Sequence, residues 1–184
     1  MRIFLCGGVN KNMKKEYLEG IRELGEAMLK RGHSIICTGA TTGAIGEVFN
    51  VYDKNNGLVK ILIAECYHKE AEAISSKHPS IIVKDLYTLQ EIAITNSDVI
   101  VVLPGGNGTL AELHMLTDNI KAGYHKNKVI IYNINGYYDS VLKTLEFAME
   151  QGTMEKSQFN EFNFVTNVDD AIAMIDKFAK KVTY

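Results

Sequence analysis

This chain of 184 residues carries a formal net charge of −2, with 46% hydrophobic and 23% charged residues. These proportions are typical of a soluble globular protein, and the absence of a basic surplus argues against nucleic acid as a partner. No apolar run is long enough to span a membrane and no signal-peptide pattern opens the sequence, so we expect a cytoplasmic protein without a membrane partner. We expect one domain over residues 1–184, because no linker-like stretch or internal repeat divides the chain.

Short apolar runs alternate with amphipathic segments along the whole chain. The runs are rich in Val, Ile and Leu, and several are continuous, as in strands that are buried on both faces of a sheet. They predict strands at Ile3–Cys6, Ser34–Thr38, Val59–Ala64, Ile81–Val83, Val99–Leu103, Val129–Asn133 and Phe162–Val165. The segments between them predict helices at Lys14–Arg31, Gly43–Asn55, Leu86–Asn96, Thr109–Lys121, Tyr137–Gln151 and Val168–Lys181.

The alternation of strands and helices predicts an α/β fold: a doubly wound, Rossmann-like parallel sheet of about seven strands flanked by helices, in a single domain. Ligands of such sheets bind beyond the carboxyl ends of the strands, where the strand order reverses. Three glycine-containing turns follow predicted strands, at Gly7–Gly8, Gly39–Gly46 and Gly105–Gly108. We expect these turns to meet at one edge of the sheet.

The segment from Pro104 to Glu112, PGGNGTLAE, is the most informative in the chain. It joins a buried strand to a helix start, where glycines let the backbone approach an anion and the first N–H groups of the helix point at it. Glu112 follows about one helical turn later. We expect it to act on another part of the same ligand, such as a ribose, because a carboxylate touching a phosphate would be repelled. The expected phosphate-binding residues are Gly105, Gly106, Asn107, Gly108 and Thr109.

The other two turns offer further ligand contacts. Gly7 and Gly8 follow the first strand, although a short strand-to-helix loop needs small residues in any such fold. The turn after the second strand contains hydroxyl side chains, which can donate hydrogen bonds to a ligand or cap the following helix. The candidates in this second turn are Gly39, Thr41, Thr42 and Gly43.

With its PGGxGTxxE motif the chain resembles the Lonely Guy (LOG) family, whose members often carry the label lysine decarboxylase-like. Further segments carry the resemblance. Met1–Gly8 is similar to the family's first strand and CGS-type turn, and Leu24–Gly25 and Arg31–His33 to its first helix and second strand. Gly39–Gly46 is similar to its GG-x-x-GLMG segment, and Asn135–Tyr138 to its NxxGYY turn. The resemblance implies a nucleoside 5′-monophosphate phosphoribohydrolase, which releases a free base and ribose 5-phosphate in the cytokinin-activating reaction of the family. It also implies a catalytic Glu112, a homodimer, a nucleoside monophosphate as ligand, and no metal or other cofactor.

The chain departs from the family on the predicted helix before the central strand. The family has an Arg-Lys pair there, and counting back from Asp98 puts Leu89 and Gln90 at the two positions. All three arginines of the chain lie within its first 31 residues, so none comes from that helix. A guanidinium would hold the ligand and lower the pKa of the glutamate. Two functions therefore stay open: the hydrolase, and a catalytically weak or inactive nucleotide-binding or carrier protein on the same fold.

The remaining reactive side chains are expected to be structural. The cysteines lie in or beside apolar runs and predict buried, reduced thiols, whereas three histidines in polar surroundings predict surface positions; none has metal-ligand spacing. Asp98 is expected to cap the preceding turn, and Tyr137 and Tyr138 to pack at a helix start. Pyridoxal phosphate-dependent decarboxylation is not expected, because no lysine lies in a recognisable Schiff-base setting. The residues concerned are Cys6, Cys37 and Cys66, and His68, His78 and His125.

Overall fold

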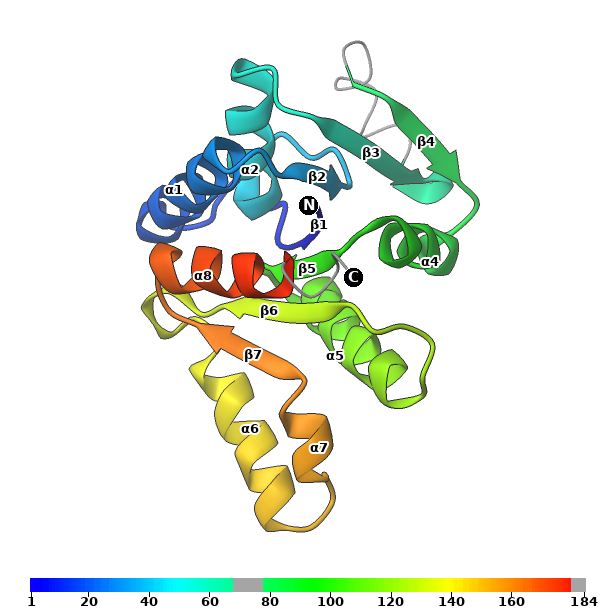
Figure 1. The fold of residues 1–184 in the computed structure, drawn as a ribbon, viewed down its shortest axis with the longest axis vertical. Helices are drawn as coiled ribbons and strands as arrows, with labels where there is room; N and C mark the ends of the chain where they lie inside the picture. Colours follow the sequence, from blue (N-terminus) through cyan, green and yellow to red (C-terminus); the bar gives the residue numbers. More distant parts are fainter. Residues whose placement is uncertain (68–77, 180–184) are drawn as a thin grey trace.

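The computed structural model describes residues 1–67 and 78–179 (Figure 1). They form a seven-stranded sheet with the strand order β4-β3-β2-β1-β5-β6-β7, and every neighbouring pair of strands is parallel. The strands are β1 (Arg2–Cys6), β2 (Ser34–Cys37), β3 (Val59–Ala64), β4 (Ser80–Val83), β5 (Val99–Val102), β6 (Lys128–Tyr132) and β7 (Phe162–Val165).

Helices connect the strands along the chain. They are α1 (Lys15–Lys30), α2 (Gly43–Lys54), α4 (Leu86–Asn96), α5 (Asn107–Lys121), α6 (Asp139–Glu150), α7 (Lys156–Phe159) and α8 (Val168–Ala179), with 3-10 turns η1 (Glu65–Tyr67) and η3 (Ile134–Gly136). The predicted α/β class, the parallel sheet and all seven strands are confirmed. The six predicted helices are present, and the structure adds the four-residue α7 and the two 3-10 turns. The predicted end of the last helix, Lys181, lies outside the described residues.

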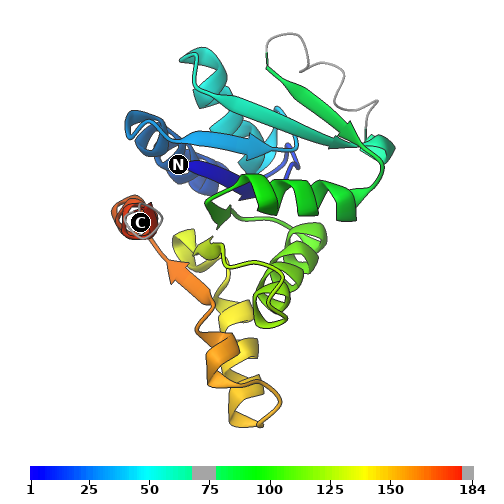
Figure 2. The ribbon, with the colours of Figure 1, turned by 45° about the vertical axis from the view of Figure 1, so that its right-hand side comes forward.

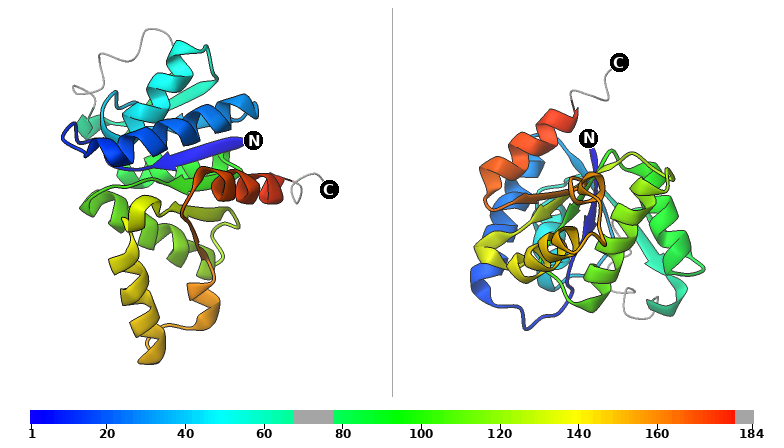
Figure 3. Two further views of the ribbon diagram at one scale, coloured as in Figure 1. Left: turned by 90° about the vertical axis from the view of Figure 1, so that its left-hand side faces the viewer. Right: turned by 90° about the horizontal axis from the view of Figure 1, so that it is seen from below.

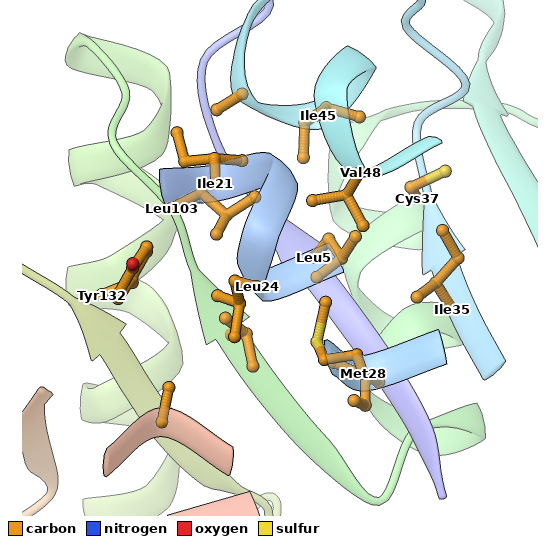
Figure 4. Close-up of a cluster of buried hydrophobic side chains, with 14 of the residues drawn as sticks. Leu5, Ile21, Leu24, Met28, Ile35, Cys37, Ile45, Val48, Leu103 and Tyr132 are labelled. Atoms are coloured by element: carbon orange, nitrogen blue, oxygen red, sulfur yellow. The ribbon is translucent and has the colours of Figure 1, made fainter. Parts of the chain in front are cut away.

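The sheet has a hydrophobic core on each face. Side chains alternate along a strand, so Ile3 and Leu5 of β1 point to one face while Phe4 and Cys6 point to the other. The first face is covered by α1, α2 and α8, whose Ile21, Leu24, Met28, Val48 and Ile175 are buried against it (Figure 4). The second face is covered by α4, α5 and α6 through Leu89, Ala93, Leu113, Leu116 and Leu145. Figures 2 and 3 show these two layers of helices with the sheet between them.

The strand order reverses between β1 and β5. The chain starts at the central β1, adds strands outward to β4, and returns through α4 to place β5 on the other side of β1. At the amino ends of β1 and β5, the Arg2 backbone N–H donates to the Asp98 carboxylate at 2.7 Å, and the Arg2 guanidinium donates to the same carboxylate at 2.9 Å. These bonds outweigh the effect of burial, so the pKa of Asp98 is lowered. Asp98 therefore fastens β5 to β1, and the predicted capping role was wrong because the cap of α4 falls on Ser97.

No helix within residues 1–67 and 78–179 is long and apolar enough to cross a membrane.

The helices α6 and α7 extend away from the sheet beyond β7 (Figures 1 and 2).

Candidate functional site

Three turns meet where the strand order reverses, at the carboxyl ends of β1, β2 and β5. The Gly8 N–H donates to the Pro104 carbonyl at 2.9 Å, which joins the turn after β1 to the turn after β5. The Ile45 N–H donates to the Gly8 carbonyl at 3.2 Å, and the Thr42 hydroxyl donates to the Val9 carbonyl at 2.7 Å, which joins the turn after β2 to the same loop. The structure thus brings the three predicted turns together, mainly by main-chain contacts. We call this group of turns, residues 7–10, 39–43 and 104–109, the glycine cradle.

Gly43 and Gly105 let the three turns pack closely, because a Cβ atom at either position would collide with a neighbouring turn. A Cβ atom on Gly43 would lie 2.6 Å from the Gly8 carbonyl oxygen, and the φ of Gly43 is +67°, a conformation that favours glycine. A Cβ atom on Gly105 would lie 2.7 Å from the Gly8 nitrogen and would also collide with the Thr109 hydroxyl. The fold itself therefore requires glycine at both positions.

Two other glycines face open space. A Cβ atom on Gly106 or Gly108 would meet no protein atom within 4 Å, and neither residue has a positive φ. The fold therefore gives no steric or conformational reason for glycine at either position. A molecule that approaches the backbone closely would give such a reason, because a methyl group would occupy part of its space. This pair is the strongest structural sign that a ligand binds against the turn.

The helices α5 and α2 both begin at the cradle without a side-chain cap. The N-cap residue of α5 is Gly106, which has no side chain, and that of α2 is Thr42, whose side chain does not cap the helix; the first turns contain no acidic residue. The uncapped N–H groups of α5 and the positive end of its dipole suit an anion. Because the Thr42 hydroxyl donates its hydrogen to the Val9 carbonyl, Thr41, whose side chain is exposed, is the better placed hydroxyl for a ligand.

Glu112 follows Thr109 on α5 by about one helical turn, and it borders the buried face of the helix that contains Leu113 and Leu116. Glu112 is half-buried, and the removal of its carboxyl group from water raises its pKa to about 7, a shift that the neighbouring Cys6 thiol opposes. Cys6 is the last residue of β1 and is 2% exposed. The pKa of its thiol is raised well above its usual range by burial and by the neighbouring carboxylate. A carboxyl group poised near pH 7 can accept or donate a proton under neutral conditions.

Two tyrosines support the turn after β5. The Tyr137 hydroxyl donates to the Gly105 carbonyl at 2.9 Å, and the buried Tyr138 hydroxyl donates to the Leu103 carbonyl at 2.7 Å. Their rings pack edge to face, with centroids 4.9 Å apart. The predicted packing role at the start of α6 is confirmed. The hydrogen bonds add that these residues fix the main chain of the cradle, which the sequence did not indicate.

No arginine lies at this edge of the sheet. The three arginines are each paired with a carboxylate: Arg2 with Asp98, Arg22 with Glu47 on α2, and Arg31 with Asp176. Leu89 and Gln90, at the positions of the family's Arg-Lys pair, are 4% and 3% exposed on the buried side of α4. The Gln90 Nε2 atom has no hydrogen-bond partner, which is costly for a buried amide.

Several other predicted roles are changed by the structure. Cys6 and Cys37 are buried as predicted, but Cys66 is exposed, because the chain leaves β3 and turns outward in η1. His78 was predicted to lie at the surface but is 9% exposed, because its Nε2 atom pairs with Asp53 at 2.8 Å and its ring packs on Phe49. His125 is half-buried, and its Nε2 atom is 3.1 Å from the Leu116 carbonyl. His68 lies outside the described residues.

Two surface pockets of about 390 Å³ each lie away from the cradle. One is lined by residues of α5, α7 and β7, including His114 and Phe162, and by Met154 before α7. His114 lines this pocket, whereas Glu112 does not. The other pocket lies at the amino ends of β2 and β3, beside His78. Within the described part of the chain, no group of three or more His, Cys, Asp and Glu side chains could hold a metal ion.

The doubly wound sheet and the glycine cradle at its switch point define a parallel α/β protein of the class that binds ligands beyond the carboxyl ends of its strands. A family model described as "Possible lysine decarboxylase" matches residues 54–175, well over half of the chain. The chain therefore belongs to this family, the LOG family that the sequence motifs resemble.

Curated relatives agree with this assignment. The chain is 27% identical to a probable cytokinin riboside 5′-monophosphate phosphoribohydrolase, LOGL3, from Oryza sativa subsp. japonica, over 97% of this chain and 83% of the relative. It is also 27% identical to the cytokinin riboside 5′-monophosphate phosphoribohydrolase LOG3 from Arabidopsis thaliana, over 82% of this chain and 70% of the relative.

Among solved structures, a molybdenum cofactor binding protein from Rippkaea orientalis has a TM-score of 0.70 at 20% identity. The match covers 97% of this chain and 96% of the Rippkaea orientalis chain. The Moco carrier protein from Chlamydomonas reinhardtii also has a TM-score of 0.70, at 18% identity and 98% coverage of both chains. At these identities the likeness shows a shared fold.

Proposed function

We propose that this protein is a nucleoside 5′-monophosphate phosphoribohydrolase, which hydrolyses the N-glycosidic bond to give a free base and ribose 5-phosphate. The observation that carries the proposal is the position of Glu112, a half-buried carboxyl group one helical turn from an uncapped helix start with two open glycines. The activity in the names of the curated relatives supports the same reaction.

In the proposed complex the 5′-phosphate lies against the turn after β5. The N–H groups of Asn107, Gly108 and Thr109 begin α5 and have no cap, so they are available to phosphate oxygens. Gly106 and Gly108 leave room for those oxygens to come close to the main chain. The side chain of Thr41 offers a further hydroxyl from the turn after β2. The phosphate fixes the ribose so that its C1′ faces Glu112.

The proposed role of Glu112 is to receive a proton and to stabilise positive charge. As the bond from C1′ to the base nitrogen breaks, the ribose gains oxocarbenium character, which an ionised carboxylate stabilises. A water oxygen bonds to C1′ and releases one proton to Glu112, while the departing nitrogen of the base takes up one proton from solvent. Glu112 then returns its proton to solvent, so charge and atoms balance over the cycle. A pKa of about 7 suits both the acceptance and the later release of that proton.

The test is base release from a panel of nucleoside monophosphates, followed by liquid chromatography. Wild-type protein is expected to release free base, and Glu112→Gln is expected to lose at least about 100-fold in rate, the size that follows removal of one group acting in the transition state. His114→Gln is a matched control on the same helix, because His114 faces the separate pocket near Phe162. Equal turnover by wild-type and Glu112→Gln protein would refute the proposed role of Glu112.

A second candidate function is a nucleotide-binding or carrier protein without useful hydrolysis. The buried Leu89 and Gln90 favour it, because neither supplies the charge of the Arg-Lys pair of the family. Two structural neighbours are named as molybdenum cofactor binding and carrier proteins, and they share the fold. A rise in melting temperature with nucleotides, together with no base release from any of them, would favour this second function.

We propose in addition that the protein is a cytoplasmic homodimer, as the family resemblance implies. Light scattering during size-exclusion chromatography measures the mass directly. A mass near twice the 20.5 kDa of one chain is expected, and a mass of one chain would refute the dimer.

A further inference from the structure

One of the two surface pockets lies at the edge of the sheet opposite to the glycine cradle, where β2 and β3 begin and the chain enters β4. Its volume of about 390 Å³ is within the range of pockets that hold small molecules. Its walls come from Ser34 at the start of β2, from residues 56–59 at the start of β3, and from His78 and Pro79 before β4. We call it the amino-edge pocket.

His78 is a polar group of this pocket with a fixed position. Its Nε2 atom is 2.8 Å from Oδ1 of Asp53, and its ring packs edge to face on Phe49 with centroids 5.5 Å apart. A carboxylate can only accept a hydrogen bond, so Nε2 carries the hydrogen, and in the neutral ring Nδ1 keeps its lone pair. The His78 ring therefore has one acceptor left for the N–H group of a ligand.

The remaining lining groups are apolar or uncharged. Leu58 is 74% exposed and stands beside Val59, which is buried, so a ligand finds an apolar surface there. The Ser34 hydroxyl, 3.4 Å from the Met1 carbonyl, and the exposed amide of Asn56 add groups that both donate and accept hydrogen bonds. A mainly apolar wall with a few fixed polar groups is typical of a small-molecule site.

The charges around the amino-edge pocket disfavour an anion. Among the described residues that line it there is no Lys or Arg, and Lys54 of the neighbouring helix turn is not one of them. The pocket follows the carboxyl end of α2, which is the negative end of the helix dipole, and Asp53 adds a carboxylate behind His78. The cradle lies at the other, positive end of the same helix. The two ends of α2 therefore favour different ligands.

We propose that the amino-edge pocket binds an uncharged, flat heterocycle with N–H donors, of the chemical class of a free nucleobase, and discriminates against the corresponding 5′-monophosphate. The flat face lies against Leu58 and Val59, and an N–H group donates to Nδ1 of His78. This second site does not depend on the proposed function, although a free base is also the product that the proposed reaction would release.

The experiment is a titration of ¹⁵N-labelled protein with adenine, followed by NMR. The amide signals of Gly57 and Val59 and the Nδ1 signal of His78 should move together and saturate, which needs no variant that could fail to fold. Leu58→Asp should weaken this binding at least about tenfold, because a charged group replaces the apolar rim. Leu86→Asp is the matched control, because Leu86 is also an exposed leucine, at 52%, but does not line the pocket.

Adenosine 5′-monophosphate is the second probe and separates this inference from the proposed function. It should move the amide signals of Gly108 and Thr109, and it should move those of Gly57 and Val59 only at concentrations at least about tenfold higher than adenine does. Adenine that leaves the Gly57 and Val59 signals unchanged, or that binds Leu58→Asp as tightly as wild-type protein, would overturn the second site alone. Equal binding of the monophosphate in the pocket would overturn it too. A protein that binds adenine there but no nucleotide at the cradle would keep the second site and overturn the proposed function.

Discussion

Replacing Gly108 by alanine separates binding from stability at the candidate site. The new methyl group would meet no protein atom within 4 Å, and the residue is the second of α5 with a non-positive φ. Alanine is favoured over glycine in helices by up to about 1 kcal/mol, so the unfolding free energy should stay the same or rise by that amount. For a chain of this size the melting temperature should rise by no more than about 2–4 °C.

The same methyl group should weaken the binding of a phosphate. It would stand between the phosphate and the N–H groups at the start of α5 and would break at least one hydrogen bond to a charged group, which contributes about 1.5–3 kcal/mol. The dissociation constant of a nucleoside monophosphate should therefore increase about 10- to 100-fold. Isothermal titration calorimetry measures this constant, and a thermal melt of the same sample measures stability.

Gly105→Ala provides the contrast within one turn. Its Cβ atom would lie 2.7 Å from the Gly8 nitrogen, and the main chain there cannot give way without shifting the cradle. This variant should lose about 1–3 kcal/mol of stability as well as binding. If Gly108→Ala binds nucleotides as tightly as the wild-type protein, no anion lies against this turn, and the reasoning from open glycines is wrong.

Three further predictions concern buried polar groups. Burial raises the pKa of Glu112 from 4.5 to about 7, so the folded protein loses stability as the pH rises through this range. In urea denaturation, the unfolding free energy of Glu112→Gln should match that of the wild-type protein near pH 4 and exceed it by at most about 3 kcal/mol above pH 8. A difference that does not change with pH would contradict the shift. Gln90→Leu should raise the unfolding free energy by about 1–3 kcal/mol, because it removes an unpartnered buried Nε2 atom, and a loss of stability would mean that the amide has a partner. Tyr137→Phe removes the bond to the Gly105 carbonyl and should cost about 1 kcal/mol and weaken nucleotide binding; calorimetry with unchanged affinity would show that the hydroxyl does not shape the cradle.

The strands and the meeting of the three turns were predictable because each depends on local pattern. Continuous apolar runs identify parallel strands, and in such a sheet the turns after strands share one edge. The helix α7 was missed because its four residues, Lys156–Phe159, are too few for helical periodicity to be visible. Its capping box of Glu155 and Gln158 was the available signal.

The proximity of Cys6 and Glu112 could not be predicted from the sequence alone. The period of two in β1 puts Cys6 on the same face as Phe4, but which helices cover that face depends on the path of the whole chain. Asp98 shows the same limit. Its sequence neighbours suggested a cap, while its partner Arg2 becomes adjacent only when β1 and β5 pair.

The central place of β1 has a consequence for the order in which the protein can fold. Arg2 and Asp98, which fasten the central strand pair, are 96 residues apart in the chain, so closing this contact requires a long loop to be ordered first. Strands β1 to β4 can pair with their neighbours as they emerge during synthesis, but they leave one flank of β1 open. Non-local pairings of this kind slow folding. We therefore expect β5 docking to be the step that extends the sheet to the other side of β1 and completes the cradle, so a nascent chain ending before β5 has four of the seven strands and an incomplete site.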